Sequence, residues 1–320
     1  MTVIDKIEQK DFCLSDEEIL DLLRINNYSN DFYRLLSVSN ELSRSKFKNR
    51  GYVFTQIGMN AEPCSKNCRF CSMGFDHYSL DFEWKKDVEA LKNELIRLQE
   101  YNFDDFFLMT TADYPVDRFI EISRQLKPLL KENQRFVANI GDFGTDVAKE
   151  LKSTGFTGVY HIIRLREGQD TLITTIKREK TIEAAQEAGL ELYYCIEPIG
   201  PEHSYEELLI EIKRARDLKI SVMAVMRRTP VLGTPLFDSG KITASELTKI
   251  AAVTNIVVNP SRAMNVHEPN QMALLAGVNQ LYAELGANPR DTKSETENSR
   301  GFTPEKAWDM LWETGYGNKS

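Results

Sequence analysis

The stretch Cys64-Ser-Lys-Asn-Cys68-Arg-Phe70-Cys71 places three cysteines at C-x3-C-x2-C spacing, with an aromatic residue just before the third. Thiolates this close together can hold three corners of a cubane iron–sulfur cluster on one short loop. The usual cubane takes a fourth thiolate, and the two remaining cysteines of the chain lie far from this stretch. The spacing therefore predicts a [4Fe-4S] cluster with one open iron, the kind of position at which a substrate or cofactor binds.

A zinc site is the simplest alternative for clustered cysteines, and His77 could supply its fourth ligand. Structural zinc sites usually combine two separated ligand pairs, and this sequence contains no second pair. The number and spacing of the cysteines favour the iron–sulfur cluster over zinc.

The same stretch resembles the signature of the radical S-adenosylmethionine (SAM) superfamily, C-x3-C-x-aromatic-C. The resemblance implies that Cys64, Cys68 and Cys71 bind the metal cluster and that Phe70 lies at the cofactor. It also implies that the open iron chelates the amino and carboxylate groups of SAM and that an electron from the cluster cleaves SAM. The resulting 5′-deoxyadenosyl radical would then abstract hydrogen from a substrate.

The composition is typical of a water-soluble globular protein. Of the 320 residues, 42% are hydrophobic, and 40 basic residues against 48 acidic ones give a net charge of −8. This balance disfavours nucleic acid or an anionic membrane surface as the main partner. The N-terminus lacks the apolar core of a signal peptide, and five cysteines of which three are clustered do not fit a disulfide framework. We therefore expect a reduced, cytoplasmic protein.

Strand and helix patterns alternate along most of the chain. Residues 15–47 are expected to be helical and to form an N-terminal leader over residues 1–50. Strands are then expected at 52–58, 104–111, 135–140, 157–165, 190–197, 219–226, 255–259 and 279–285. Helices are expected at about 81–101, 115–131, 145–154, 171–188, 203–217, 243–254, 267–276 and 303–314. Eight such units predict an α/β fold, a parallel (βα)8 TIM-type barrel over residues 51–320. The polar stretch 286–302 would form a lid.

Parallel α/β barrels carry their chemistry at the C-terminal ends of the strands, which makes polar residues there candidates for the site. After the second strand, Thr110, Thr111 and Asp113 replace the Gly-Gly-Glu-like turn that binds the SAM amino group in radical SAM proteins. Asp113 could equally cap the helix that follows. After the third strand, Asn139 could bind a ribose or substrate, or form an Asx turn.

The fourth strand ends in Arg164, Arg166 and Glu167, a charge combination that suits a zwitterionic ligand or a surface ion-pair cluster. From about residue 50 to 315 the chain resembles the biotin synthase-like branch of the superfamily. That resemblance implies that Glu167 is an acidic SAM ligand. It also implies that Arg178, eleven residues before Gly189, binds the SAM carboxylate.

Five further candidates lie at the ends of strands five to seven. Glu197 and Cys195 share one strand face, although a cysteine in an apolar strand is more often a small core residue. Arg227 and Arg228 could clamp an anionic substrate group, although strand alternation lets only one of them face the mouth. They precede Gly-Thr-Pro-Leu at 233–236, which matches a loop of the branch. Arg262 offers one more cation.

The resemblance implies hydrogen abstraction from a small polar, anionic substrate in the biosynthesis of a cofactor or an amino-acid-derived metabolite. Sulfur insertion of the biotin or lipoyl synthase type usually consumes a second cluster, for which the chain has no obvious ligand set. Rearrangement, fragmentation or maturation chemistry is therefore favoured, and a zinc-stabilised barrel acting as a binding module is the alternative from another class. Expected partners are the small-molecule substrate, an electron donor such as ferredoxin or flavodoxin, and a possible partner protein.

Overall fold

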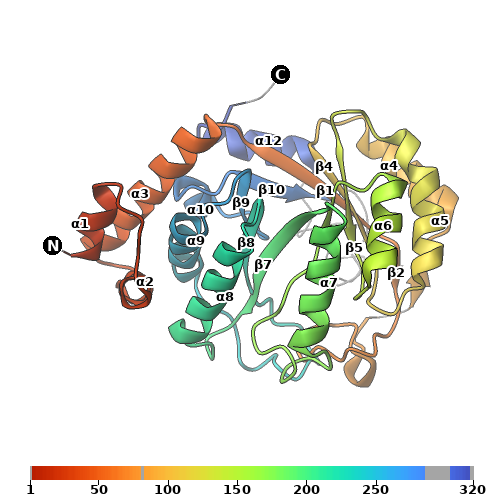
Figure 1. Ribbon diagram of the computed structural model, residues 1–320, viewed down its shortest axis with the longest axis horizontal. Helices are drawn as coiled ribbons and strands as arrows, with labels where there is room; N and C mark the ends of the chain where they lie inside the picture. Colours follow the sequence, from red (N-terminus) through yellow and green to blue (C-terminus); the bar gives the residue numbers. More distant parts are fainter. Residues whose placement is uncertain (1, 81–82, 285–302, 318–320) are drawn as a thin grey trace.

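Eight parallel strands close into a barrel in the computed structural model, which describes residues 2–80, 83–284 and 303–317 (Figure 1). The order around the barrel is β1-β10-β9-β8-β7-β6-β5-β4, so strands that are consecutive in sequence are also neighbours in space. This arrangement confirms the predicted TIM-type fold. The barrel strands are β1 (Tyr52–Gly58), β4 (Asp105–Met109), β5 (Arg135–Asn139), β6 (Gly158–Tyr160), β7 (Glu191–Ile199), β8 (Val222–Arg227), β9 (Ala263–Val266) and β10 (Gln280–Ala283).

Helices cover the outside of the barrel (Figure 1). Most bury one apolar face against it, as Leu91 and Leu95 of α4 do. Side-chain caps start most of them; Ser204, for example, forms a capping box at the start of α8. The helices are α4 (Val88–Leu98), α5 (Val116–Leu126), α6 (Thr145–Thr154), α7 (Thr175–Glu187), α8 (Tyr205–Asp217), α9 (Ala244–Val258), α10 (Gln271–Leu275) and α12 (Pro304–Glu313). Two 3-10 turns, η1 (Phe75–His77) and η2 (Lys127–Leu129), and a small antiparallel pair, β2 (Asn60–Ala61) with β3 (Trp84–Lys85), complete the described elements.

The N-terminal leader contains α1 (Val3–Glu8), α2 (Asp16–Leu23) and α3 (Asn30–Phe47), of which α1 was not expected from the sequence. Helix α3 packs along α9. Buried hydrogen bonds join the two, because the Asn255 side chain donates to the hydroxyls of Ser39 (2.9 Å) and Ser43 (3.0 Å). The leader is therefore docked on the outside of the barrel through α9.

The position of the seventh strand was predicted wrongly. Residues expected to form it, 255–259, are the end of α9, and the strand follows at Ala263–Val266. Helix α9 lies between the barrel and the leader, so nearly all of its residues are buried, and its C-terminal half has no polar face. An apolar, β-branched run of this kind has no helical period and looks like a strand. Asn259, in the left-handed conformation at φ 49°, ends the helix.

The inside of the barrel is filled by aromatic rings from four strands. Phe54, Phe107, Tyr193 and Tyr282 pack with centroid separations of 5.3 to 6.0 Å. A packed interior of this kind leaves the chemistry to the loops at the strand ends. The loops that follow the strands gather at the lower edge of Figure 1. None of the helices in the described ranges combines the length and apolarity needed to span a membrane. The predicted lid, 286–302, lies outside the described residues.

Candidate active site

The three clustered cysteines line one cavity at the mouth of the barrel. Cys64, Cys68 and Cys71 share this cavity with Thr110, which follows β4, and Asn139, which ends β5. The cysteine loop closes on itself, because the Cys64 amide donates to the Met73 carbonyl (2.7 Å) and the Phe75 amide donates back to the Cys64 carbonyl (3.0 Å). Phe70 also lines the cavity. The sequence-predicted metal ligands and Phe70 thus come together with the ends of two strands.

Burial of the loop raises the pKa of the Cys68 thiol to about 12 and also raises the pKa of Cys64. Binding of a metal cluster must therefore displace protons from these thiols. In the described part of the chain, no three His, Cys, Asp or Glu side chains are arranged to hold a single metal ion. His77, the candidate fourth zinc ligand, directs its Nε2 at the backbone carbonyls of Cys68 and Cys71, each 3.1 Å away.

Asp113 does not cap the helix that follows it, and its carboxylate contacts the cysteine loop. Its carboxylate accepts from the backbone amide of Ser65 (2.6 Å) and pairs with Lys66 (2.9 Å), both in the cysteine loop. Helix α5 begins after Pro115 without a side-chain cap. Hydrogen bonds to Lys66 and Ser65 outweigh burial and lower the pKa of Asp113. Asp113, in the turn after β4, therefore holds the cysteine loop in place through Ser65 and Lys66.

Polar groups on the cavity wall remain available to a ligand. The Thr110 hydroxyl is buried and has no hydrogen-bond partner among the described residues. Asn139 lines the cavity, and no described residue bonds its side-chain amide. Thr111 differs, because its hydroxyl accepts from the buried Asn60 amide (2.9 Å). A buried hydroxyl without a partner is costly unless a ligand or water satisfies it, so Thr110 marks a polar binding wall.

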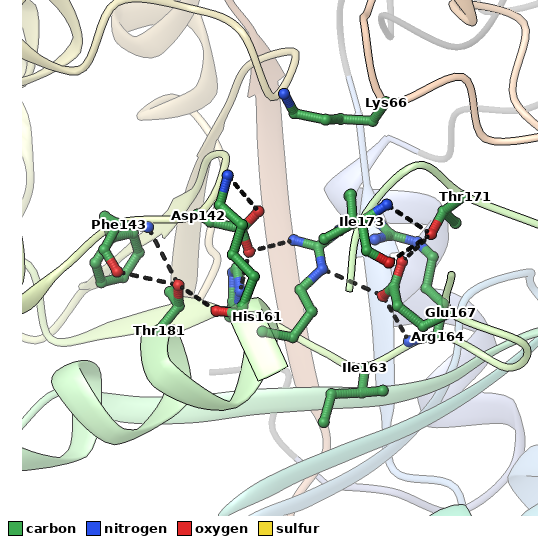
Figure 2. A network of polar contacts seen from close by, with 12 residues as sticks. Lys66, Asp142, Phe143, His161, Ile163, Arg164, Glu167, Thr171, Ile173 and Thr181 are labelled. Atoms are coloured by element: carbon green, nitrogen blue, oxygen red, sulfur yellow. Dashed lines mark hydrogen bonds and ion pairs between the residues drawn. The ribbon is translucent and has the colours of Figure 1, made fainter. Parts of the chain in front are cut away.

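Arg178 also lines the cavity, and two buried carboxylates hold it in place. Its Nη1 donates to Asp142 (3.1 Å) and its Nε donates to Glu167 (3.2 Å). Figure 2 shows Asp142 and Glu167 on opposite sides of this network. No described residue accepts a hydrogen bond from Nη2 of Arg178, which leaves N–H groups for an anion. Glu167 does not line the cavity. Its two carboxylate oxygens accept hydrogen bonds from Thr171 and Arg178.

His161, at the end of β6, supports Asp142 from behind, with Nε2 3.1 Å from Oδ1 (Figure 2). Burial lowers the pKa of His161 to about 4 and outweighs the hydrogen bond to Asp142. Neutral His161 therefore donates its Nε2 proton. Burial acts to raise the pKa of Asp142, but the bond from His161 and the charge of Arg178 hold it at about 2. The site thus keeps Asp142 charged beneath Arg178.

Arg164 forms a second cationic position, on the barrel side of the cavity. Its Nε lies 3.3 Å from a carboxylate oxygen of Glu197, which also accepts from the Tyr160 hydroxyl (3.0 Å). The Glu197 side chain is 1% exposed, whereas that of Arg164 is 21% exposed and lines the cavity. No described residue accepts a hydrogen bond from Nη1 or Nη2 of Arg164. Two arginines thus offer unused N–H groups to the same cavity.

Three predicted arginines are used elsewhere. Arg166 points away from the cavity and pairs with Glu207 on α8. The other two are occupied by carboxylates from neighbouring loops: Arg227 by Glu268 and Arg228 by Glu202. Arg228 also donates to the Gly240 carbonyl (2.9 Å), so it ties the Gly-Thr-Pro-Leu loop to the β7–α8 loop. Neither Arg227 nor Arg228 is free to clamp a substrate in this arrangement.

Arg262 lies at the opposite end of the barrel from the predicted site, because it precedes β9 instead of following it. It donates to both carboxylate oxygens of Asp105 (2.5 and 2.6 Å) at the base.

Cys195 is fully buried in β7 and does not line the cavity, which fits the small core residue that the sequence allowed. Tyr160, His161 and Asp142 were not among the predicted site residues. Asp142 follows the predicted strand 135–140, and that position was the available signal. His161 lies within the predicted strand 157–165 and follows β6 only because the strand ends earlier, at Tyr160.

Comparison with known proteins identifies relatives that share most of this length. Biotin synthase of Clostridioides difficile (strain 630) is 26% identical over 259 residues, which cover 77% of this chain and 78% of that protein. Biotin synthase of Anaplasma marginale (strain Florida) is 25% identical over 314 residues, covering 91% and 94%. No protein-family model matches the chain.

Solved structures share the fold at lower sequence identity. Methylornithine synthase superposes with a TM-score of 0.84 at 16% identity, covering 99% of this chain and 97% of its own. The [FeFe]-hydrogenase maturase HydG from Carboxydothermus hydrogenoformans gives a TM-score of 0.82 at 17% identity, covering 98% and 77%. These structures support the barrel architecture over nearly the whole chain.

Proposed function

We propose that this chain, a radical SAM enzyme of the biotin synthase-like branch with a [4Fe-4S] cluster, abstracts hydrogen from a small anionic substrate that Arg164 binds. The observation that carries the proposal is the pair of arginines with unused N–H groups at one cavity. SAM has one carboxylate. A second guanidinium in the same cavity is therefore left for an anionic group of another ligand.

The residues at the mouth fit the two cofactors. Cys64, Cys68 and Cys71 would hold the cluster, and Arg178 with Thr110 would bind SAM. When bound, the cluster and SAM supply reductive cleavage and a radical that removes hydrogen from the substrate. The chain contributes orientation: Asp142 and Glu167 fix the Arg178 guanidinium, and the cavity wall excludes water from the reacting groups.

The substrate would lie between Arg164 and the cluster side of the cavity. Glu197 and Tyr160 keep the Arg164 side chain extended toward the cavity and leave its terminal N–H groups for a carboxylate or phosphate. Glu197 also balances the buried positive charge when no substrate is bound. Recognition by a partly buried guanidinium that a carboxylate holds in place favours anionic substrates over neutral analogues.

The overall transformation is proposed to be rearrangement, fragmentation or maturation chemistry. The sequence relatives are biotin synthases, which would favour sulfur insertion. Sulfur insertion of that kind usually consumes a second cluster, but only two cysteines lie outside the loop. Cys13 is exposed in the leader and Cys195 is buried in β7. The reaction requires an electron donor, for which we propose a ferredoxin or flavodoxin in the cytoplasm.

The test uses protein reconstituted with iron and sulfide, dithionite as reductant, and SAM, all under anaerobic conditions. Pools of small carboxylates and phosphates are screened for compounds that stimulate 5′-deoxyadenosine formation. We expect stimulation by an anionic compound, and loss of that stimulation in Arg164→Met while the basal cleavage of SAM persists. Stimulation by a neutral compound that survives in Arg164→Met would contradict the substrate assignment.

A further inference from the structure

His77 lies in the turn after the cysteine loop, and its side chain contacts the backbone of that loop. Its Nε2 lies 3.1 Å from the carbonyl oxygens of both Cys68 and Cys71. Carbonyl oxygens only accept hydrogen bonds, so Nε2 of His77 carries a proton and shares it between the two carbonyls. One side chain thus ties together the backbone of two of the three predicted cluster ligands.

Gly74 makes room for the His77 ring. A Cβ atom at position 74 would lie 2.3 Å from both Cε1 and Nε2 of His77. The backbone of Gly74 has φ −57° and ψ 133°, which any residue can adopt. The three atoms nearest to a Cβ at this position all belong to the His77 ring. Glycine here keeps the ring against the loop, where it reaches both carbonyls.

Two hydrogen bonds between Asn67 and Asp76 also hold this turn against the cysteine loop. Asn67, with φ 46°, donates from its amide to the Asp76 carboxylate (2.9 Å) and accepts from the Asp76 backbone amide (3.0 Å). Asp76 precedes His77 in the turn, so this pair sets the position from which the His77 ring reaches back. The turn Phe75–His77 therefore serves as a clip on the cysteine loop.

We propose that His77 is a positioning residue of the cluster loop, and not a metal ligand. By fixing the Cys68 and Cys71 carbonyls, it holds these two cysteines in the arrangement that takes the cluster. This inference rests on the proposed cluster at Cys64, Cys68 and Cys71. Hydrogen bonding and solvent access around a cluster set its stability and reduction potential, so the clip influences both.

The experiment compares four variants with the wild-type protein after anaerobic reconstitution. His77→Phe keeps the ring volume without the donor, and His77→Gln restores an N–H donor. Gly74→Ala keeps the donor but displaces the ring. Phe75→Ala, whose side chain is largely exposed in the same turn, is the matched control. The measurements are iron content, the rate of iron release to a chelator, and the midpoint potential of the cluster.

We expect His77→Phe and Gly74→Ala to bind the same amount of iron as wild type and to release it about tenfold faster, with a shifted potential. His77→Gln should recover most of the difference, and Phe75→Ala should match wild type. The double variant Gly74→Ala/His77→Phe should be no worse than His77→Phe alone, because both changes remove the same contact.

Two results would overturn the proposal. Additive effects of the two changes would show that Gly74 does not act through His77. Complete loss of iron in a His77→Phe protein that melts like wild type in its metal-free form would show that His77 is a ligand. Failure of the wild-type protein to take up any iron–sulfur cluster is a separate outcome, and it would refute the proposed function and not the role of His77 alone.

Discussion

The two ends of the barrel both bury arginines beside carboxylates, but they use the charges differently. At the base, Arg262 donates to both oxygens of Asp105, which also accepts from the Tyr193 hydroxyl (2.6 Å). At the mouth, Arg178 and Arg164 each contact carboxylates and still keep N–H groups that no described residue uses. The base faces a packed aromatic layer, whereas the mouth faces a cavity.

Burial and charge alone therefore do not distinguish a site from a structural ion pair. Arg228 is almost fully buried, but Glu202 and a backbone carbonyl occupy its donors. The difference lies in hydrogen-bonding capacity that the fold leaves unfilled. Buried polar groups without partners are costly, so they persist where a ligand completes them.

The largest effect is expected at the mouth, from Cys68→Ala. Loss of one of three thiolates should abolish cluster assembly and all 5′-deoxyadenosine formation, because the reaction depends on the bound cluster. The loop lies outside the barrel core, so circular dichroism and the melting temperature of the metal-free protein should match wild type. Global unfolding of the variant would show that the loop also holds the fold.

The base should respond in stability and not in cofactor binding. Arg262→Met leaves the Asp105 carboxylate buried without its cation, which should lower the free energy of unfolding by about 3–5 kcal/mol. Urea titration measures this loss, and SAM binding by the folded protein should be unchanged. The double variant Asp105→Leu/Arg262→Met should lose less than Arg262→Met, since it leaves no charge unpaired. Weakened SAM binding in a folded Arg262→Met protein would connect the base to the site.

His161 gives the mouth a pH-dependent contribution to the free energy of unfolding. Its pKa is about 4 in the folded protein, against an ordinary value of 6.5. The unfolded chain therefore binds more protons between these values, and the free energy of unfolding should fall by about 2 kcal/mol from pH 7 to pH 5. His161→Gln keeps a donor for Asp142 and should remove this contribution. If urea titrations gave wild type and His161→Gln the same pH dependence of the free energy of unfolding, this contribution of His161 would be contradicted.

The sequence predicted the barrel and the cysteine cavity because both depend on local patterns. Alternating strand and helix signals gave seven of the eight strands, and α9 failed because the leader buries its outer face. The relatives confirm the predicted radical SAM class and its cofactors. Local spacing was sufficient for these conclusions.

The partners of the charged residues could not be predicted in the same way. Arg228 meets Glu202 and Gly240, and Asp113 meets Ser65 and Lys66, through contacts between separate loops. A residue at a strand end is a candidate for the site, but only the folded loops decide whether its donors are already used. Arg164 and Arg166 illustrate this, because they are two residues apart and only Arg164 lines the cavity.

Arg178 and Arg166 provide the most direct test of this distinction. Arg178→Ala removes the unused N–H groups from the cavity and leaves Asp142 and Glu167 without their shared cation. We expect SAM to bind about tenfold more weakly, with no loss of iron from the reconstituted protein. Isothermal titration of SAM under anaerobic conditions measures the change.

Arg166→Ala is the matched control, because Arg166 lies on the same loop as Glu167 but pairs with Glu207 on α8. Its removal takes away the same charge from the loop that precedes α7, the helix that carries Arg178. A general electrostatic effect on SAM would therefore appear in both variants. We expect the affinity of Arg166→Ala for SAM to equal that of wild type. Equal weakening in the two variants would mean that net positive charge near the mouth, and not an unfilled donor at Arg178, attracts the SAM carboxylate.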